Sequence, residues 1–310
     1  MKKWITIILL LVIVLAGAVY FFIPTRENFT YRVNAACKSD AATRLIINKD
    51  RWKNWWPGQQ KNDTVYSYKH YDYKINTIYF NGFEATVTDN GNLVSGLLQV
   101  ISEENNNTVL QWATNFVYSP NLVTRLLQYG QAGSIKTNIK SLLGSMKDYF
   151  DKEENVYGFK VTEQKVTDSS LVSLKQKFSH YPTTQEVYSM INSLKGYINK
   201  KGGEAINPPM LNVHTDDSVN FETMVAIPVK KDLPSEGIFQ QKKMILGNIL
   251  VAEVKGGASA VAKDEMELRN YLNDFRRSSP AIPYQSLVTD RLRESDSSKW
   301  ITRWYYPVFR

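Results

Sequence analysis

The sequence predicts an α+β protein with an apolar N-terminal helix, an antiparallel sheet around a long helix, and a duplicated βαββ domain with pseudo-twofold symmetry. Residues 4–23 carry no charge. A series of β-rich segments from residue 65 to 119 precedes a long segment with helical spacing of apolar residues. The text PMLNVHTD at 209–216 recurs as PYQSLVTD at 283–290, which indicates an internal repeat.

The N-terminal segment has the length and composition of a membrane span. Lys2 and Lys3 precede twenty uncharged residues, and Pro24 follows them. Twenty helical residues extend about 30 Å, the thickness of the hydrocarbon layer. The sequence therefore predicts an uncleaved single-pass anchor over residues 1–26, with a cleaved signal peptide as the alternative. The two lysines predict a cytoplasmic N-terminus and folded domains on the periplasmic side of a bacterial membrane.

Composition excludes several classes of partner and cofactor. The formal net charge is +8, but Lys and Arg are spread along the chain without a run of five. No phosphate-binding glycine motif opens a helix, and no helix-turn-helix is indicated. Cys37 is the single cysteine, and His70, His180 and His214 are far apart. We expect no nucleic acid partner, no cofactor and no metal site.

The first folded region reads as a strand over residues 28–36, a helix ending near Asn48, a tryptophan-rich segment and then an antiparallel meander. A long helix is predicted after the meander, because its apolar residues recur at steps of three and four: Ile135, Ile139, Leu142, Leu143, Met146 and Phe150.

This order of elements, with the text DRWKNWWP at 50–57, resembles the SRPBCC superfamily of START-like and polyketide-cyclase-like domains. The resemblance covers residues 27–152. It implies a helix-grip fold with an apolar cavity for a lipid-like or aromatic ligand. Aromatic side chains bury large areas wherever they lie, so core packing is the alternative role for the candidate ligand-binding residues Trp52 and Trp55 and the weaker candidates Trp112 and Phe116.

The second half contains two copies of a strand–helix–strand–strand unit, over residues 155–230 and 239–309. A capping box from Thr183 to Glu186 begins the first helix, and the second helix is predicted over 259–277. Residues 239–257 read as one strand segment before it. Two such units bury both helices and a sheet face together. The groove between the copies is the predicted pocket.

The texts VAIPV at 225–229, VAEVKGG at 251–257, IPYQSLVTD at 282–290 and W-x-x-x-W-x-Y-P-V at 300–308 resemble the GyrI-like, or AraC-type effector-binding, domain. The resemblance covers residues 153–310. It implies a small amphipathic ligand, often cationic, between the two halves. Some members of this family hydrolyse reactive compounds, and others bind a protein. The position of the family's glutamate is Gln285 here, and Leu287 replaces the usual tyrosine.

A glutamine offers an amide hydrogen bond but no negative charge and no general base. We therefore predict no catalytic residue, although Glu222 or Glu253 could replace the missing carboxylate. The predicted function is membrane-anchored binding of a hydrophobic or amphipathic small molecule. A hydrolase or cyclase, or sequestration of a protein partner, are the alternatives. Alternate strand residues face opposite ways, so the predicted lining pairs are Gln285 with Leu287 and Trp304 with Tyr306.

Overall fold

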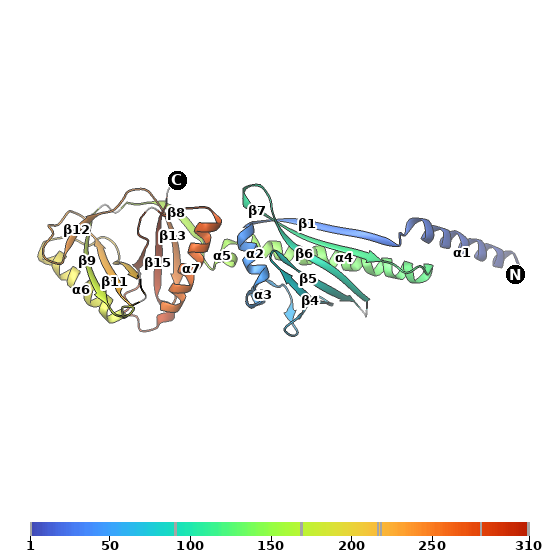
Figure 1. The fold of residues 1–310 in the computed structure, drawn as a ribbon, viewed down its shortest axis with the longest axis horizontal. Helices are drawn as coiled ribbons and strands as arrows, with labels where there is room; N and C mark the ends of the chain where they lie inside the picture. Colours follow the sequence, from blue (N-terminus) through green and yellow to red (C-terminus); the bar gives the residue numbers. More distant parts are fainter. Residues whose placement is uncertain are drawn as a thin grey trace. The chain divides into compact units, whose positions relative to one another are not determined.

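The computed structural model describes residues 2–89, 92–167, 170–215, 217, 219–279 and 281–308. The chain forms two compact units, Met1–Val156 and Tyr157–Arg310, and Figure 1 shows the elements of each. The fold is α+β, with one antiparallel sheet in each unit.

The first unit begins with helix α1, Lys2–Phe22. Among the described residues, its segment Lys3–Phe22 is the one helix that is long and apolar enough to cross a membrane. Its apolar side chains are largely exposed, as Leu10 at 63% and Phe22 at 82% illustrate.

The sheet of the first unit has seven antiparallel strands in the order β1-β7-β6-β5-β4-β3-β2. Short helices α2 (Ser39–Ile47) and α3 (Trp52–Trp55), with the turn η1 (Lys49–Arg51), connect β1 to the meander. The strands are β1 (Arg26–Lys38), β2 (Gln59–Gln60), β3 (Val65–Tyr68), β4 (Tyr71–Tyr79), β5 (Gly82–Asp89), β6 (Asn92–Ser102) and β7 (Asn107–Val117).

The long helix α4, Leu122–Phe150, packs against this sheet (Figure 1). Asn121 caps its first turn by accepting hydrogen bonds from the backbone of Val123 and Thr124. All six apolar residues that predicted the helix are buried, because their spacing places them on one face of it. The predicted sheet around a long helix is confirmed. Helix α5, Glu153–Tyr157, follows α4.

The second unit has an eight-stranded antiparallel sheet in the order β12-β9-β11-β10-β14-β15-β13-β8. Two helices accompany it, α6 (Thr184–Lys200) and α7 (Ala258–Asp274). The strands are β8 (Val161–Lys165), β9 (Ser170–Phe178), β10 (Met210–Thr215), β11 (Phe221–Pro228), β12 (Gln240–Lys243), β13 (Asn248–Lys255), β14 (Tyr284–Leu287) and β15 (Ile301–Val308).

The strand order of this sheet is symmetric about its centre. The first copy supplies β9, β11 and β10, and the second supplies β14, β15 and β13 in the mirrored order. The copies meet where β10 pairs antiparallel with β14, at Met210–Ser286 and Leu211–Gln285. An antiparallel central pair places the local twofold axis between its strands. The predicted duplication is confirmed.

The leading strands of the two copies are exchanged. Strand β8 begins the first copy but pairs with β13 of the second, whereas β12 begins the second copy and pairs with β9 of the first. The expectation of one strand over residues 239–257 is therefore wrong: β12 and β13 are separate strands at different positions in the sheet.

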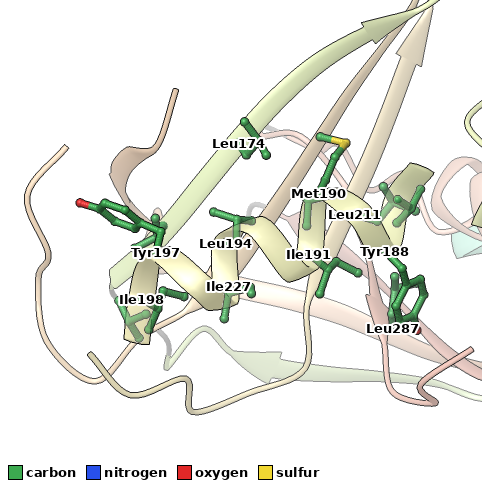
Figure 2. Packing of buried hydrophobic residues seen from close by; sticks show 14 of the residues in the cluster. Leu174, Tyr188, Met190, Ile191, Leu194, Tyr197, Ile198, Leu211, Ile227 and Leu287 are labelled. Atoms are coloured by element: carbon green, nitrogen blue, oxygen red, sulfur yellow. The ribbon is translucent and has the colours of Figure 1, made fainter. Parts of the chain in front are cut away.

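Helices α6 and α7 lie on the same face of this sheet. Leu211 and Gln285 are directly paired, and Gln285 is directly paired with Trp304, so the three side chains share a face. Leu211 belongs to the core beneath α6, and Trp304 donates a hydrogen bond to the carbonyl of Val261 in α7. Figure 2 shows the apolar residues of α6 turned toward Leu174, Leu211, Ile227 and Leu287 of the sheet.

Candidate functional site

A cavity of about 510 Å³ lies between the beginnings of α6 and α7. Thr183 and Thr184 line it from the start of α6, and Ala258 and Ser259 line it from the start of α7. The volume is within the range of small-molecule sites in proteins. We call this cavity the interhelical cleft.

Gln285 and Trp304 lie in the wall of the cleft that the sheet forms. They face each other across the β14–β15 pair and are 6% and 5% exposed. The indole Nε1 of Trp304 donates to the backbone carbonyl of Val261 at 3.3 Å, which fixes the ring against α7. The structure thus brings together two of the residues proposed from the sequence.

The other two candidates of the second unit, Leu287 and Tyr306, share this face but line none of the described cavities. Leu287 packs in the core beneath α6, close to Tyr188 (Figure 2). Tyr306 is buried beside Glu265 and Arg269, and burial raises the pKa of its hydroxyl to about 12. The two helices cover the parts of the face where these residues lie.

Trp52 and Trp55 of the first unit are 0% and 2% exposed. Their indole groups donate to the backbone carbonyls of Ile46 and Leu45 at 2.7 and 3.0 Å. The ring of Trp52 also lies 4.8 Å from that of Phe83, between centroids. Every polar group of these side chains therefore has a protein partner, as the core-packing alternative requires.

Sequence reasoning missed three polar residues of the cleft, Tyr181, Glu265 and Arg291. The carboxylate of Glu265 is paired with Arg269, one turn later in α7, at 2.8 Å. The hydroxyl of Tyr181 interacts with the Gln285 amide, and burial raises its pKa. Arg291 directly follows the repeated sequence at 283–290 that drew attention to Gln285, but nothing in a loop sequence indicates where such a side chain points.

The two alternative carboxylates lie outside the interhelical cleft. Glu222 pairs with Lys175, and Glu253 pairs with Arg303 at 2.9 Å. Glu222 lines a second cavity, of about 330 Å³, which shares Tyr181, Gln285 and Trp304 with the cleft. Among the described residues, no group of three or more His, Cys, Asp or Glu side chains is placed to hold a metal ion.

A third cavity, of about 300 Å³, lies on the opposite, helix-free face of the same sheet. Three methionines line it: Met210, Met224 and Met244. The ring of Tyr284 also lies on this face, stacked on that of Tyr305 at 5.0 Å between centroids. Tyr284 and Gln285 thus point to opposite faces, as strand alternation predicts.

No family model and no curated protein matches the chain. Among solved structures, it is similar to the EcmrR C-terminal domain at 13% identity, with a TM-score of 0.42, over 49% of this chain and 98% of that one. It is also similar to EcmrR in a complex with DNA, at 14% identity and a TM-score of 0.46, over 62% of this chain and 73% of that one. A third similar structure is SAV2435 bound to tetraphenylphosphonium, at 12% identity and a TM-score of 0.34, over 48% of this chain and 94% of that one.

The topology of residues Tyr157–Arg310, with two βαββ copies about a central antiparallel pair, is by itself consistent with a GyrI-like fold.

Proposed function

We propose that the protein is a membrane-anchored binding protein whose small-molecule ligand occupies the interhelical cleft. The observation that carries the proposal is the cavity of about 510 Å³ between the two copies, with Gln285 and Trp304 in its wall. Apolar side chains such as Val187, Leu211 and Val261 form much of the remaining wall. An apolar cavity with a few placed polar groups is the usual form of a ligand site.

Binding needs no catalytic group, which agrees with the amide at position 285. The carboxylate that lines the cleft, Glu265, is paired with Arg269 at 2.8 Å. The arrangement therefore supports a binding protein better than a hydrolase or cyclase.

A cleft-filling variant tests the site. Ala262 is an exposed residue of α7 that lines the cleft, and Ala262→Phe should fill part of it without disturbing the core. We expect native mass spectrometry of the full chain, released from detergent, to show a co-purified small molecule on the wild type and none on Ala262→Phe. The same adduct on both proteins would contradict binding in this cleft.

The anchor and the orientation are part of the proposal. The exposed apolar surface of α1 supports a membrane span, and Lys2 and Lys3 support a cytoplasmic N-terminus. We expect the chain to remain in the membrane pellet after alkaline carbonate extraction. Protease added to intact spheroplasts should digest both folded units. Release of the chain by carbonate would refute the membrane anchor. Protection of both units from the protease would refute the orientation.

The helix-free face of the second sheet favours protein-partner binding as a second candidate function. Ile245, Leu246 and Ile282 are 68%, 67% and 58% exposed, and two of them border the methionine-lined cavity. Methionine side chains adapt to varied apolar partners. If this face binds a protein, Ile245→Asp should abolish cross-linking of that partner to the full chain in membranes, while Ala262→Phe should leave the cross-link intact.

A further inference from the structure

We infer that the ligand of the interhelical cleft is an amphipathic anion, with a carboxylate-like head bound at Arg291 and an apolar body. The inference rests on the proposed function and adds the chemical class of the ligand. It differs from the cationic ligand that the family resemblance implies, and it depends on the charges around the cleft.

Arg291 is held in place by three contacts. Its backbone N–H donates to the Tyr188 hydroxyl at 2.7 Å, and its Nη2 donates to Oγ1 of Thr302 at 2.8 Å. The guanidinium carbon lies 4.9 Å from the centroid of the Trp300 ring, a cation–π geometry. The guanidinium group is therefore preorganised in the wall of the cleft.

The charge of Arg291 is not balanced inside the cleft. Its Nε is buried and has no hydrogen-bond partner among the described residues. Burial lowers the pKa of Arg291, and the nearby hydroxyls of Tyr188 and Tyr181 oppose that effect, yet an arginine remains charged in proteins. The other charged residue that lines the cleft, Glu265, is paired with Arg269. An anionic ligand in the cleft would supply the missing negative charge.

The start of α7 adds to the positive potential. Its N-cap residue, Gly257, makes no side-chain capping hydrogen bond, and the next two residues, Ala258 and Ser259, line the cleft. The first N–H groups of a helix and its dipole favour an anion there. The start of α6 contributes less, because Thr183 and Glu186 form a capping box that already uses its N–H groups.

The rest of the cleft suits an apolar body. Trp304, Val261, Val187 and Leu211 line it, and Gln285 can donate or accept a hydrogen bond with either end of a ligand. A free inorganic anion would leave this apolar surface unused. The geometry therefore points to an aromatic or aliphatic carboxylate rather than to a small ion.

Three probes with one naphthalene body test the head-group preference: 2-naphthoate, 2-naphthamide and 2-naphthylmethylammonium. We would measure their dissociation constants by equilibrium dialysis at neutral pH against the full chain in phosphatidylcholine nanodiscs, with empty nanodiscs as the reference. We expect the carboxylate to bind at least about tenfold more tightly than the amide, and the ammonium to bind weakest. Equal or tighter binding of the amide or the ammonium would overturn the inference.

Arg291→Gln should reduce the ratio of carboxylate to amide affinity to about one, because the carboxylate loses more affinity than the neutral amide. Arg293→Gln is the matched control, because Arg293 lies two residues later in the same loop with 89% of its side chain exposed. It should keep the wild-type ratio.

If Arg291→Gln does not fold, Arg291→Lys serves instead and should retain a preference for the carboxylate, since the charge remains. An unchanged ratio in Arg291→Gln, or loss of the preference in a folded Arg291→Lys, would contradict the role of this charge.

Ala262→Phe separates this inference from the proposed function. If it abolishes binding of all three probes while the wild type shows no preference for the carboxylate, the cleft is a ligand site but the anion inference is wrong. If it leaves the binding of every probe unchanged, the cleft is not the site and both proposals fail.

Discussion

At the scale of single residues, the chemistry of the cleft depends on the charge of Arg291, whose position could not be predicted from the sequence. Gln285 and Trp304 could be proposed from strand alternation and from the repeated text. Arg291 could not, because its position depends on contacts with Tyr188, Thr302 and Trp300, which come from other segments. Burial of its Nε without a partner is visible only in three dimensions.

Gln285→Glu should reverse the charge preference of the cleft. Gln285 and Arg291 both line it, and both act on the hydroxyl of Tyr181. A carboxylate at position 285 would therefore become the counter-ion of Arg291. We expect 2-naphthoate affinity to fall about tenfold or more and the ammonium probe to gain affinity, measured by the same dialysis. Gln164→Glu, on an exposed position of β8, is the control. A variant that binds the carboxylate as the wild type does would refute the assignment.

Asp217 should make the hairpin that joins β10 to β11 sensitive to acid. Its carboxylate accepts hydrogen bonds from the backbone N–H groups of Asn220 and Val219 at 2.7 and 2.9 Å. These bonds lower its pKa from 3.8 to about 2. A depressed folded-state pKa means that the stabilisation is complete above pH 3.8 and is lost as the pH falls toward 2. The backbone amides of this hairpin should therefore exchange hydrogen faster in Asp217→Ala than in the wild type at pH 5. The difference in exchange rate between the two proteins should shrink at pH 2.5. A difference that does not depend on pH would contradict this account.

At the scale of elements, the helices were predictable and the outer strands were not. The apolar residues of α4 and α6 recur at helical spacing, and the same residues are buried in the structure. Strands β8 and β12 have the sequences VTEQK and QQKK. They lie at the two edges of the sheet, where polar residues are usual, so they carry no alternating pattern from which a pairing partner could be inferred.

Thr183→Ala should loosen the first turn of α6. The Thr183 side chain accepts from the backbone of Glu186, and the Glu186 side chain accepts from the backbone of Thr183. Loss of an N-cap costs about 1 kcal/mol of stability. We expect faster hydrogen exchange in peptides that cover residues 183–188, measured by mass spectrometry, and little change for the neighbouring control Thr184→Ala. Equal exchange in the two variants would show that the cap does not hold this turn.

At the scale of the whole molecule, the α+β class, the sheet around α4 and the duplication follow from sequence patterns. The position of the cleft needs the structure, because the face that carries Gln285 also carries Leu287 and Tyr306, and only the placement of α6 and α7 decides which part stays open.

The two copies should not fold apart. Residues 157–236 lack β12, the strand that pairs with β9, and residues 237–310 lack β8, the strand that pairs with β13. We expect each fragment alone to be insoluble or self-associated, and the two expressed together to co-purify as one complex by size-exclusion chromatography. A monomeric 157–236 fragment with a dispersed NMR spectrum would contradict this expectation.

The exchange of leading strands has a consequence for how such a duplicated domain could arise. A gene that encoded one copy would yield a chain that lacks the edge strand its sheet needs, and only a second identical chain could supply that strand. The product would therefore have to form a symmetric homodimer. The two ends of the cavity between its subunits would then carry identical residues. Joining the copies in one polypeptide removes that constraint. Aligning Pro209 with Pro283 places Leu211 opposite Gln285 and Asp217 opposite Arg291. Fusion therefore allows the two ends to recognise chemically different groups, as a molecule with unlike head and tail requires.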